Sequence, residues 1–188
     1  MPAVDRDGTF LDVGCANGLL MESVAAWAAE DGFQVEPYGL ELIESLAALA
    51  RRRLPRWADR IFAGNVMTWR PPLRFDFVRT ELEYVPPPRR SEMVERLLRE
   101  YLVYGGRLIA RSYGSARRPR PRVEPVGEIM RDRGYKLAGE AEGVDTNGAV
   151  FTRVAWTDLP EARCLKPVAF YSIVSDTTLS PACLSGTQ

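Results

Sequence analysis

A short apolar segment, 9–13, runs directly into a turn of small residues, 14–18. Polar residues precede the segment and glycine follows it, which is typical of a short buried β-strand. The residues after the turn repeat apolar side chains at helical spacing as far as Asp31-Gly32, a helix-ending pair. A buried strand that turns through glycine into an amphipathic helix is the opening unit of an open α/β sheet.

The same alternation continues along the chain. Short apolar runs predict further strands at 35–39, 61–63, 75–78, 107–111, 135–140 and 149–156. Apolar stripes at a period of 3.6 predict further helices at 42–53, 91–102 and 126–133. This order implies a mainly parallel sheet covered by helices on both faces, with the last two strands joined as an antiparallel pair.

Composition excludes several classes of function. The chain has 188 residues, of which 46% are apolar and 27% charged, and this suits one globular domain. Histidine is absent, so a Ser-His-Asp triad, a Cys-His pair and an HExxH zinc site cannot form within the chain. Three scattered cysteines do not make a zinc cluster, so we expect no metal. The 25 Lys and Arg balance 25 Asp and Glu, which argues against a general nucleic-acid binder.

Location and domain limits follow from the ends of the chain. The N-terminus is polar, and no apolar run is long enough for a secretory signal or a membrane span. We therefore expect a cytoplasmic protein with free thiols, the alternative being a Cys164–Cys183 disulfide in an oxidising compartment. One domain is expected over 1–159. Residues 160–188 form a tail with one apolar stretch, 168–174, and either add an edge strand or lid or remain a partly ordered terminus.

The first turn indicates a ligand. Asp12 closes the strand, and small residues follow at positions 14, 16 and 18. Ligands of open α/β sheets lie beyond the carboxyl ends of the strands, where small residues let the backbone approach closely. The spacing differs from the GxGxxG of dinucleotide folds, and a carboxylate would repel a pyrophosphate. A ligand with positive groups and no phosphate, such as adenosylmethionine, fits better; the alternative is a purely structural tight turn.

Two further strand ends carry candidate contacts. Glu41 follows the second strand, where a carboxylate can accept from both ribose hydroxyls, and Leu42 beside it would pack on adenine. Asn65 follows the third strand and can offer its side-chain amide to the adenine edge. The alternatives are a solvated acid at a helix start for Glu41 and a simple turn residue for Asn65.

At this point the chain resembles the class I S-adenosylmethionine-dependent methyltransferases over about residues 8–157. The segments that carry the resemblance are LDVGCANG at 11–18, GLE at 39–41, AGN at 63–65, FDFV at 75–78 and LVYGGRLI at 102–109. The resemblance implies an α/β fold, a Rossmann-like doubly wound seven-stranded sheet whose last strand is antiparallel, with S-adenosylmethionine as cofactor. The implied cofactor-binding residues are Asp12, Gly14, Cys15, Ala16, Gly18, Glu41, Leu42, Asn65, Val66 and Thr80.

The chain departs from the family at several points. Ala16 replaces the commoner second glycine, Asn65 stands where Asp is usual, and Tyr104 where Pro is frequent. The helical N-terminal segment that closes over the site in the family is nearly absent, since the first strand begins about nine residues in. The alternatives are an open site for a large substrate, a lid from the tail, from 84–88 or from a second subunit, and a weak or inactive enzyme.

The acceptor should approach at the end of the fourth strand. Without histidine, any general base must be a carboxylate or a phenolate, and the candidate catalytic residues are Glu81, Glu83 and Tyr84. The alternative is that the two acids are loop residues paired with Arg79 or Arg89. The candidate acceptor-binding residues are Arg79, Tyr113 and Arg117, the last two from an arginine-rich loop. Nucleic acid is the weaker interpretation of this loop, because no aromatic ladder accompanies it.

The sequence therefore predicts a methyltransferase that acts on a small-molecule acceptor, and it leaves a homodimer open. The first alternative is a cofactor-binding but catalytically inactive module. The second is an NAD-dependent oxidoreductase.

Overall fold

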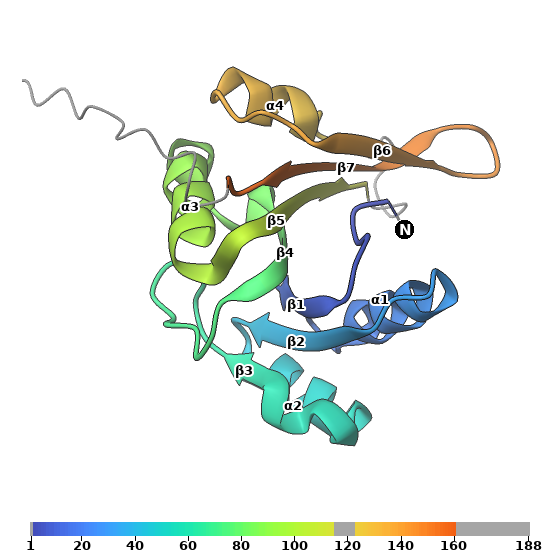
Figure 1. The fold of residues 1–188 in the computed structure, drawn as a ribbon, viewed down its shortest axis with the longest axis vertical. Helices are drawn as coiled ribbons and strands as arrows, with labels where there is room; N and C mark the ends of the chain where they lie inside the picture. The colour runs from blue at the N-terminus through green and yellow to red at the C-terminus, as the bar shows by residue number, and fades with distance from the viewer. Residues whose placement is uncertain (1, 115–122, 161–188) are drawn as a thin grey trace, which may run out of the picture.

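The computed structural model describes residues 2–114 and 123–160. Within them, seven strands form one sheet in the order β3-β2-β1-β4-β5-β7-β6 (Figure 1). Neighbouring strands among β1 to β5 are parallel, β7 is antiparallel to β5, and β6 is antiparallel to β7. The strands are β1 Gly8–Val13, β2 Val35–Glu41, β3 Ile61–Ala63, β4 Phe75–Glu81, β5 Leu102–Tyr113, β6 Gly139–Val144 and β7 Val150–Asp158. The predicted doubly wound seven-stranded sheet is confirmed.

Helices pack on both faces of this sheet. The α-helices are α1 Leu19–Glu30, α2 Glu44–Arg53, α3 Arg90–Arg96 and α4 Val126–Asp132. Short helical segments join them, namely η1 Pro55–Arg60, η2 Leu82–Tyr84, η3 Pro87–Arg89 and η4 Leu97–Tyr101. In Figure 1, α1 and α2 lie beside the β1–β2–β3 part of the sheet, and α3 and α4 lie beside the part formed by β5, β7 and β6.

Strand alternation divides the core between the two faces. On one face, Leu11, Val78 and Leu108 pack with Met93 of α3 and Met130 of α4. On the other, residues of α1 and α2 bury the sheet through two smaller clusters. Among the described residues, the second face is covered sparsely where Phe10, Phe77, Ile109 and Trp156 lie, because α1 is the one described helix that contributes to their cluster, beside the N-terminal residues Ala3 and Val4.

Arg107 ties the N-terminal residues to the last strand. Its guanidinium donates to Asp158 at 2.6 Å, to Asp5 at 3.0 Å and to the Ala3 carbonyl at 3.4 Å. Hydrogen bonds in which both partners are charged are among the stronger ones in proteins. The segment before β1 is therefore held against the edge of the second face.

Three elements differ from the sequence prediction. The helix expected over 91–102 is α-helical only over Arg90–Arg96 and continues as a π-helix over Leu97–Tyr101. β5 then begins at Leu102, and a bulge absorbs the residues before Arg107, where Gly105 adopts φ +74°. The strand expected over 135–140 was wrong in position, since β6 begins four residues later and spans Gly139–Val144. Tyr135 and Leu137 still pack on the core from the preceding irregular segment, so their alternation gave a misleading strand pattern.

β4 is longer than the sequence suggested. It extends to Glu81, so Arg79, Thr80 and Glu81 belong to the strand and not to the loop after it. Because successive side chains of a strand alternate, Arg79 and Glu81 share one face and Thr80 lies on the other. This places two charged side chains of β4 on the sparsely covered face.

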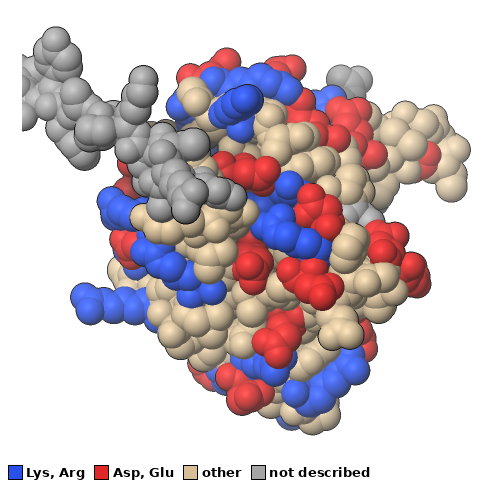
Figure 2. Space-filling view, viewed as in Figure 1, with Lys and Arg blue, Asp and Glu red and all other residues tan. Residues whose placement is uncertain are grey.

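The surface carries both signs of charge. On the face shown in Figure 2, acidic and basic side chains are interspersed over the described residues. No helix in the described part of the chain is long and apolar enough to span a bilayer.

Candidate functional site

The turn between β1 and α1 contains three residues with positive φ within five positions. Gly14 and Gly18 adopt φ +75° and +77°, and Ala16 between them adopts φ +47°, a conformation that costs a residue with a Cβ roughly 1–2 kcal/mol. Ala16 is the one non-glycine residue with positive φ among those described. Strain of this kind persists where the surroundings hold it in place, and it gathers at functional sites.

Glu41 holds the strained turn. Its Oε2 accepts from the Ala16 amide at 2.8 Å, and its Oε1 accepts from the Ile43 amide at 2.9 Å. The carboxylate is buried and closes β2, directly beside the carboxyl end of β1. Each carboxylate oxygen has a second lone pair, so Glu41 keeps acceptor capacity for a ligand.

Most backbone amides of the turn already donate hydrogen bonds within the protein. Gly14 and Cys15 donate to the Leu40 carbonyl at 2.7 and 3.2 Å, Gly18 donates to the Cys15 carbonyl at 2.8 Å, and Leu19 donates to the Asn17 side chain at 3.1 Å. With Ala16, five of the six amides from Gly14 to Leu19 have an acceptor. A pyrophosphate site needs such amides to point at the ligand. The turn is therefore poorly suited to a phosphate-bearing ligand.

A cluster of buried charges lies beside the turn. Arg79 Nη1 donates to Asp12 Oδ1 at 3.1 Å and to the Tyr84 hydroxyl at 3.3 Å, and Arg79 also forms a close ion pair with Glu81. The side chains of Asp12 and Arg79 are only 1% and 6% exposed. Burial raises the pKa of Asp12 above its ordinary value, and the adjacent Arg79 opposes that shift. Arg79 is thus the cation that allows a carboxylate to persist in this buried position.

Tyr84 covers the glycine of the turn. A Cβ placed on Gly14 would lie 2.3 Å from the Tyr84 hydroxyl oxygen, so the two residues are in direct contact. Burial raises the pKa of Tyr84 to about 12, so the phenol remains protonated near neutral pH. Tyr84 can therefore position a ligand by hydrogen bonding, while its phenolate is not populated as a base at that pH.

A cavity of about 630 Å³ opens next to this cluster on the sparsely covered face. Most of the site residues predicted at the first turn and at the carboxyl end of β4 line this cavity. The predicted residues that line it are Asp12, Gly14, Cys15, Ala16, Arg79, Glu81, Tyr84 and Tyr113.

The remaining predicted residues lie elsewhere. Glu41 and Gly18 flank the same turn without lining the cavity, and Leu42 is 66% exposed next to Glu41. Thr80 is fully buried on the opposite face of β4. Glu83 accepts from the Ser112 hydroxyl at 3.3 Å, away from the cavity. Arg117 lies outside the described residues.

Asn65 and Val66 occupy the turn after β3. The Asn65 side-chain oxygen accepts from the Met67 amide at 2.8 Å, which leaves its side-chain nitrogen as the group that can donate to a ligand. The Val66 carbonyl accepts from the buried Tyr101 hydroxyl at 2.8 Å. The Tyr101 hydroxyl thus anchors the turn that carries the predicted adenine contacts.

The sequence analysis missed Arg111 and the apolar floor of the cavity. Ile109, Arg111 and Tyr113 alternate along β5 and point to the same face as Arg79 and Glu81, with Arg111 directly opposite Glu81. The available signal was the period of two in this strand, combined with the position of Trp156 on β7. β5 extends to Tyr113, two residues beyond the predicted strand, so Tyr113 belongs to the strand and not to the arginine-rich loop.

Cys15 lies inside the turn and is buried. Burial, together with the nearby Asp12 and Glu41 carboxylates, raises the pKa of its thiol to about 12. Glu41 accepts from the Ala16 amide next to Cys15, and Asp12 lines the same cavity as Cys15, so both carboxylates lie near this turn. Because only thiolate reacts, we expect native Cys15 to alkylate at least about 1,000-fold more slowly at pH 8 than after unfolding in urea. Mass-spectrometric mapping of iodoacetamide adducts measures this, and rapid native labelling of Cys15 would contradict the buried, protonated state.

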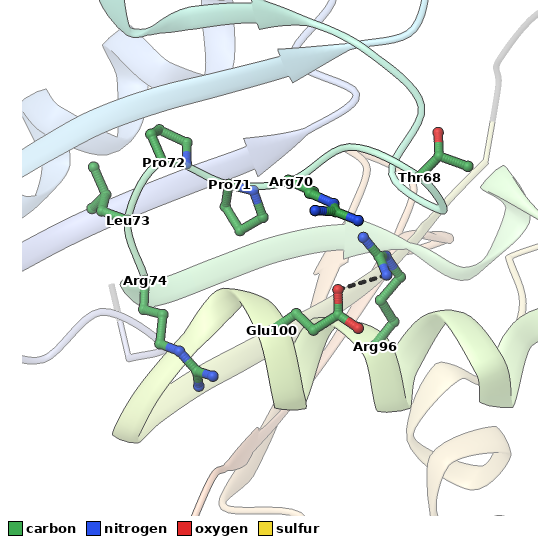
Figure 3. Close-up of a pocket in the computed structure, with 8 residues that line it drawn as sticks. All are labelled: Thr68, Arg70, Pro71, Pro72, Leu73, Arg74, Arg96 and Glu100. Atoms are coloured by element: carbon green, nitrogen blue, oxygen red, sulfur yellow. Dashed lines mark ion pairs between the residues drawn. The ribbon is translucent and has the colours of Figure 1, made fainter.

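A second hollow, of about 740 Å³, lies between the β3–β4 connection and α3 (Figure 3). Figure 3 shows Arg70 beside Arg96, with Arg74 pointing away from them. Arg96 pairs with Glu100 at 2.6 Å and donates to the Val66 and Trp69 carbonyls at 3.1 and 2.8 Å. Its guanidinium therefore serves to hold the long β3–β4 connection against α3, and this hollow shares no residue with the site.

Comparison with known proteins gives similarity of fold. No family model matches the chain, and no curated protein sequence matches it. Among solved structures, the N-methyltransferase NodS from Bradyrhizobium japonicum WM9, in complex with S-adenosyl-L-homocysteine, aligns with TM-score 0.60 and 16% identity over 81% of this chain and 78% of that one. The glycopeptide N-methyltransferase MtfA, complexed with S-adenosylmethionine, aligns with TM-score 0.60 and 16% identity over 81% of this chain and 82% of that one.

A third similar structure has a different activity. The [4+2]-cyclase SpnF aligns with TM-score 0.58 and 16% identity over 84% of this chain and 76% of that one. One architecture can host more than one chemistry, so the activity of this chain has to be argued from its own site. With the sheet order, the antiparallel last strand and these alignments, the chain has the fold of the class I S-adenosylmethionine-dependent methyltransferases.

Proposed function

We propose that this protein is an S-adenosylmethionine-dependent methyltransferase that acts on a small-molecule acceptor. The observation that carries the proposal is the convergence of Asp12 and Glu41 on one strained turn whose own amides are largely occupied. Such a site favours a ligand with positive and hydroxyl groups over one with phosphates. The ammonium, sulfonium and ribose of S-adenosylmethionine match this donor set.

Four residues would hold the cofactor at two ends. Asp12 would accept from its ammonium group, and Glu41 would accept from its ribose hydroxyls. Leu42 offers an exposed apolar side chain for the adenine face, and Asn65 keeps an amide nitrogen for the adenine edge. When bound, the cofactor supplies an electrophilic methyl group.

The cavity beside Gly14 is the place for the acceptor. Glu81 and Tyr84 line it and are held by Arg79, so they can fix an acceptor by hydrogen bonds. Because Tyr84 is protonated near neutral pH and Glu81 is already ion-paired, neither is a strong base. The site suits an acceptor that is nucleophilic without deprotonation, and catalysis would come from positioning and exclusion of water.

An inactive cofactor-binding module is the second candidate, because the acceptor cavity is open on the sparsely covered face. Incubation with labelled S-adenosylmethionine and a cell extract, followed by measurement of S-adenosylhomocysteine, separates the two. Turnover supports an enzyme, and tight cofactor binding without turnover supports the module. In parallel calorimetry, binding of NAD with no binding of S-adenosylmethionine would reject both in favour of an oxidoreductase.

Replacing Glu41 tests the ribose contact. Glu41→Gln keeps an oxygen for one backbone amide and removes the charge, so we expect S-adenosylmethionine binding to weaken by about 1–3 kcal/mol in calorimetry. Glu44→Gln is the matched control, since Glu44 is exposed and pairs with Arg51 of the same helix, α2. Equal affinity of the Glu41 variant and the wild type would remove Glu41 from the ribose role.

A further inference from the structure

The cavity that receives the acceptor has a polar end and an apolar floor, both set by strand register. One row of side chains across the sheet consists of Asp12, Arg79, Ile109 and Trp156. The next row toward the carboxyl ends contains Glu81, Arg111 and Val154. The charged members of both rows lie on β1, β4 and β5, and the apolar members lie on β5 and β7.

Apolar side chains also form the walls. Leu20, Val24 and Trp27 of α1 and Phe151 of β7 line the cavity. Leu19, Trp27, Tyr113 and Phe151, all at the cavity, are between 38% and 56% exposed. Large apolar side chains gathered around an open cavity mark a binding site more often than scattered ones do.

The polar end holds two carboxylates, Asp12 and Glu81, and two arginines, Arg79 and Arg111, and among the described residues only Arg79 forms salt bridges with these carboxylates. Asp12 and Glu81 both pair with Arg79, so neither is the partner of Arg111. Arg111 donates from Nε to the Thr152 hydroxyl at 3.2 Å and lies 5.1 Å from the Tyr113 ring centroid, and it forms no salt bridge with any described residue. Burial and the neighbouring Arg79 lower the pKa of Arg111, and the nearby Glu81 and Asp12 carboxylates, both paired with Arg79, oppose that shift.

We propose that the cavity binds an amphipathic ligand whose apolar body lies on Ile109, Val154 and Trp156 and whose anionic group pairs with Arg111. A planar guanidinium with free N–H groups matches a carboxylate or sulfonate in two-pronged geometry. The inference rests on the proposed function in one respect, that this ligand is the methyl acceptor. The anionic apolar character of the ligand follows from the cavity itself.

Direct binding of simple probes tests the proposal without any turnover. Decanoate and decan-1-ol share an apolar chain and differ in charge, and each can be titrated below its micellar or solubility limit. Trp27 and Trp156 line the cavity, so tryptophan fluorescence reports occupancy beside calorimetry. We expect decanoate to bind about tenfold or more tightly than decan-1-ol, the range for a hydrogen-bonded charge.

Variants locate the site. Arg111→Gln should abolish the preference for decanoate over decan-1-ol, and Arg111→Lys should restore part of it because the charge returns. Ser23→Trp, on the α1 wall, should weaken both probes by filling the cavity. Arg153→Gln is the matched control, since Arg153 lies on the neighbouring strand and pairs with Glu142.

The outcomes are distinct. Equal binding of the two probes, or a preference that survives in Arg111→Gln, overturns the proposal. So does absence of binding, including the case in which sedimentation shows a second copy of the chain on this face. Titration of the same samples with S-adenosylhomocysteine separates this inference from the proposed function. If decanoate binds selectively and S-adenosylhomocysteine does not bind, the methyltransferase proposal is rejected and the proposed site for an anionic ligand stands. If S-adenosylhomocysteine binds and decanoate does not bind selectively, only this inference is rejected.

Discussion

Replacing Arg79 with methionine should lower the free energy of unfolding by about 3–5 kcal/mol at pH 7.5, the cost of leaving one partner of a buried ion pair alone. Arg79 is the only cation that pairs with Asp12 among the described residues, and both side chains are nearly inaccessible. Methionine keeps an unbranched aliphatic stem and removes the guanidinium, so the loss reports chiefly the charged group. Urea denaturation followed by circular dichroism measures it.

The pH dependence of this variant has a definite sign. Burial already raises the pKa of Asp12 in the presence of Arg79, and removing Arg79 removes the charge that opposes this shift, so the folded variant binds the proton more tightly than the folded wild type. Stability is then greatest at low pH and falls as the pH rises through the raised pKa. The difference between variant and wild type should therefore shrink between pH 8 and pH 5, and a difference that widens on acidification would contradict the assignment.

Two further variants separate charge from packing. Asp12→Asn in the Arg79→Met background removes the stranded charge and should recover part of the loss. Arg131→Met removes the exposed pair with Glu140, which should cost less than about 1 kcal/mol. Equal losses in Arg79→Met and Arg131→Met would show that the buried pair has no special role.

The second large effect concerns Asp12 and the charge of the ligand. Asp12→Asn should weaken S-adenosylmethionine binding by about 100-fold, because it removes a charged acceptor and leaves Arg79 partly uncompensated near a cationic ligand. S-adenosylhomocysteine lacks the sulfonium charge, so its affinity should fall by less. Calorimetry with both ligands gives the ratio directly.

The control is an exposed acid of the same type. Asp132→Asn, at the end of α4, should leave both affinities unchanged. A parallel fall for both ligands in Asp12→Asn would show that Asp12 acts through the fold of the turn and not through the charge of the ligand. Unchanged binding of both would exclude Asp12 from the site.

Much of the fold was predictable because the spacing of apolar residues in the sequence matches the period of the strand or helix that forms there. The strand over 9–13, the turn of small residues and the helix after it appear as β1 Gly8–Val13, Gly14–Gly18 and α1 Leu19–Glu30. The antiparallel end of the sheet was also predicted. Local pattern was sufficient here because each element buries one continuous apolar face.

Prediction failed where tertiary packing overrode local pattern. The π-helix over Leu97–Tyr101 continues the stripe of the helix before it, so periodicity alone does not separate the two. Tyr135 and Leu137 alternate as strand residues do, although they pack on the core from an irregular segment. Both cases depend on contacts with distant parts of the chain.

The sequence predicted which residues gather at the site better than it predicted the contacts that each of them makes. Asp12 and Glu41 were found from their places at strand ends, but the hydrogen bond from Ala16 to Glu41 depends on which way a peptide group faces. Arg79 was expected to bind the acceptor, and the structure shows it paired with Asp12 and Glu81. That partner choice follows from a strand three residues longer than predicted, which places Arg79 beside Asp12 in the register of β1 and β4.

A crystal structure of the protein grown with S-adenosylhomocysteine tests the central claim most directly. The account predicts the ligand across the carboxyl ends of β1 and β2, with its amino group within hydrogen-bonding distance of Asp12 and its ribose hydroxyls on Glu41. A ligand bound elsewhere, or one that leaves either carboxylate without contact, would contradict it.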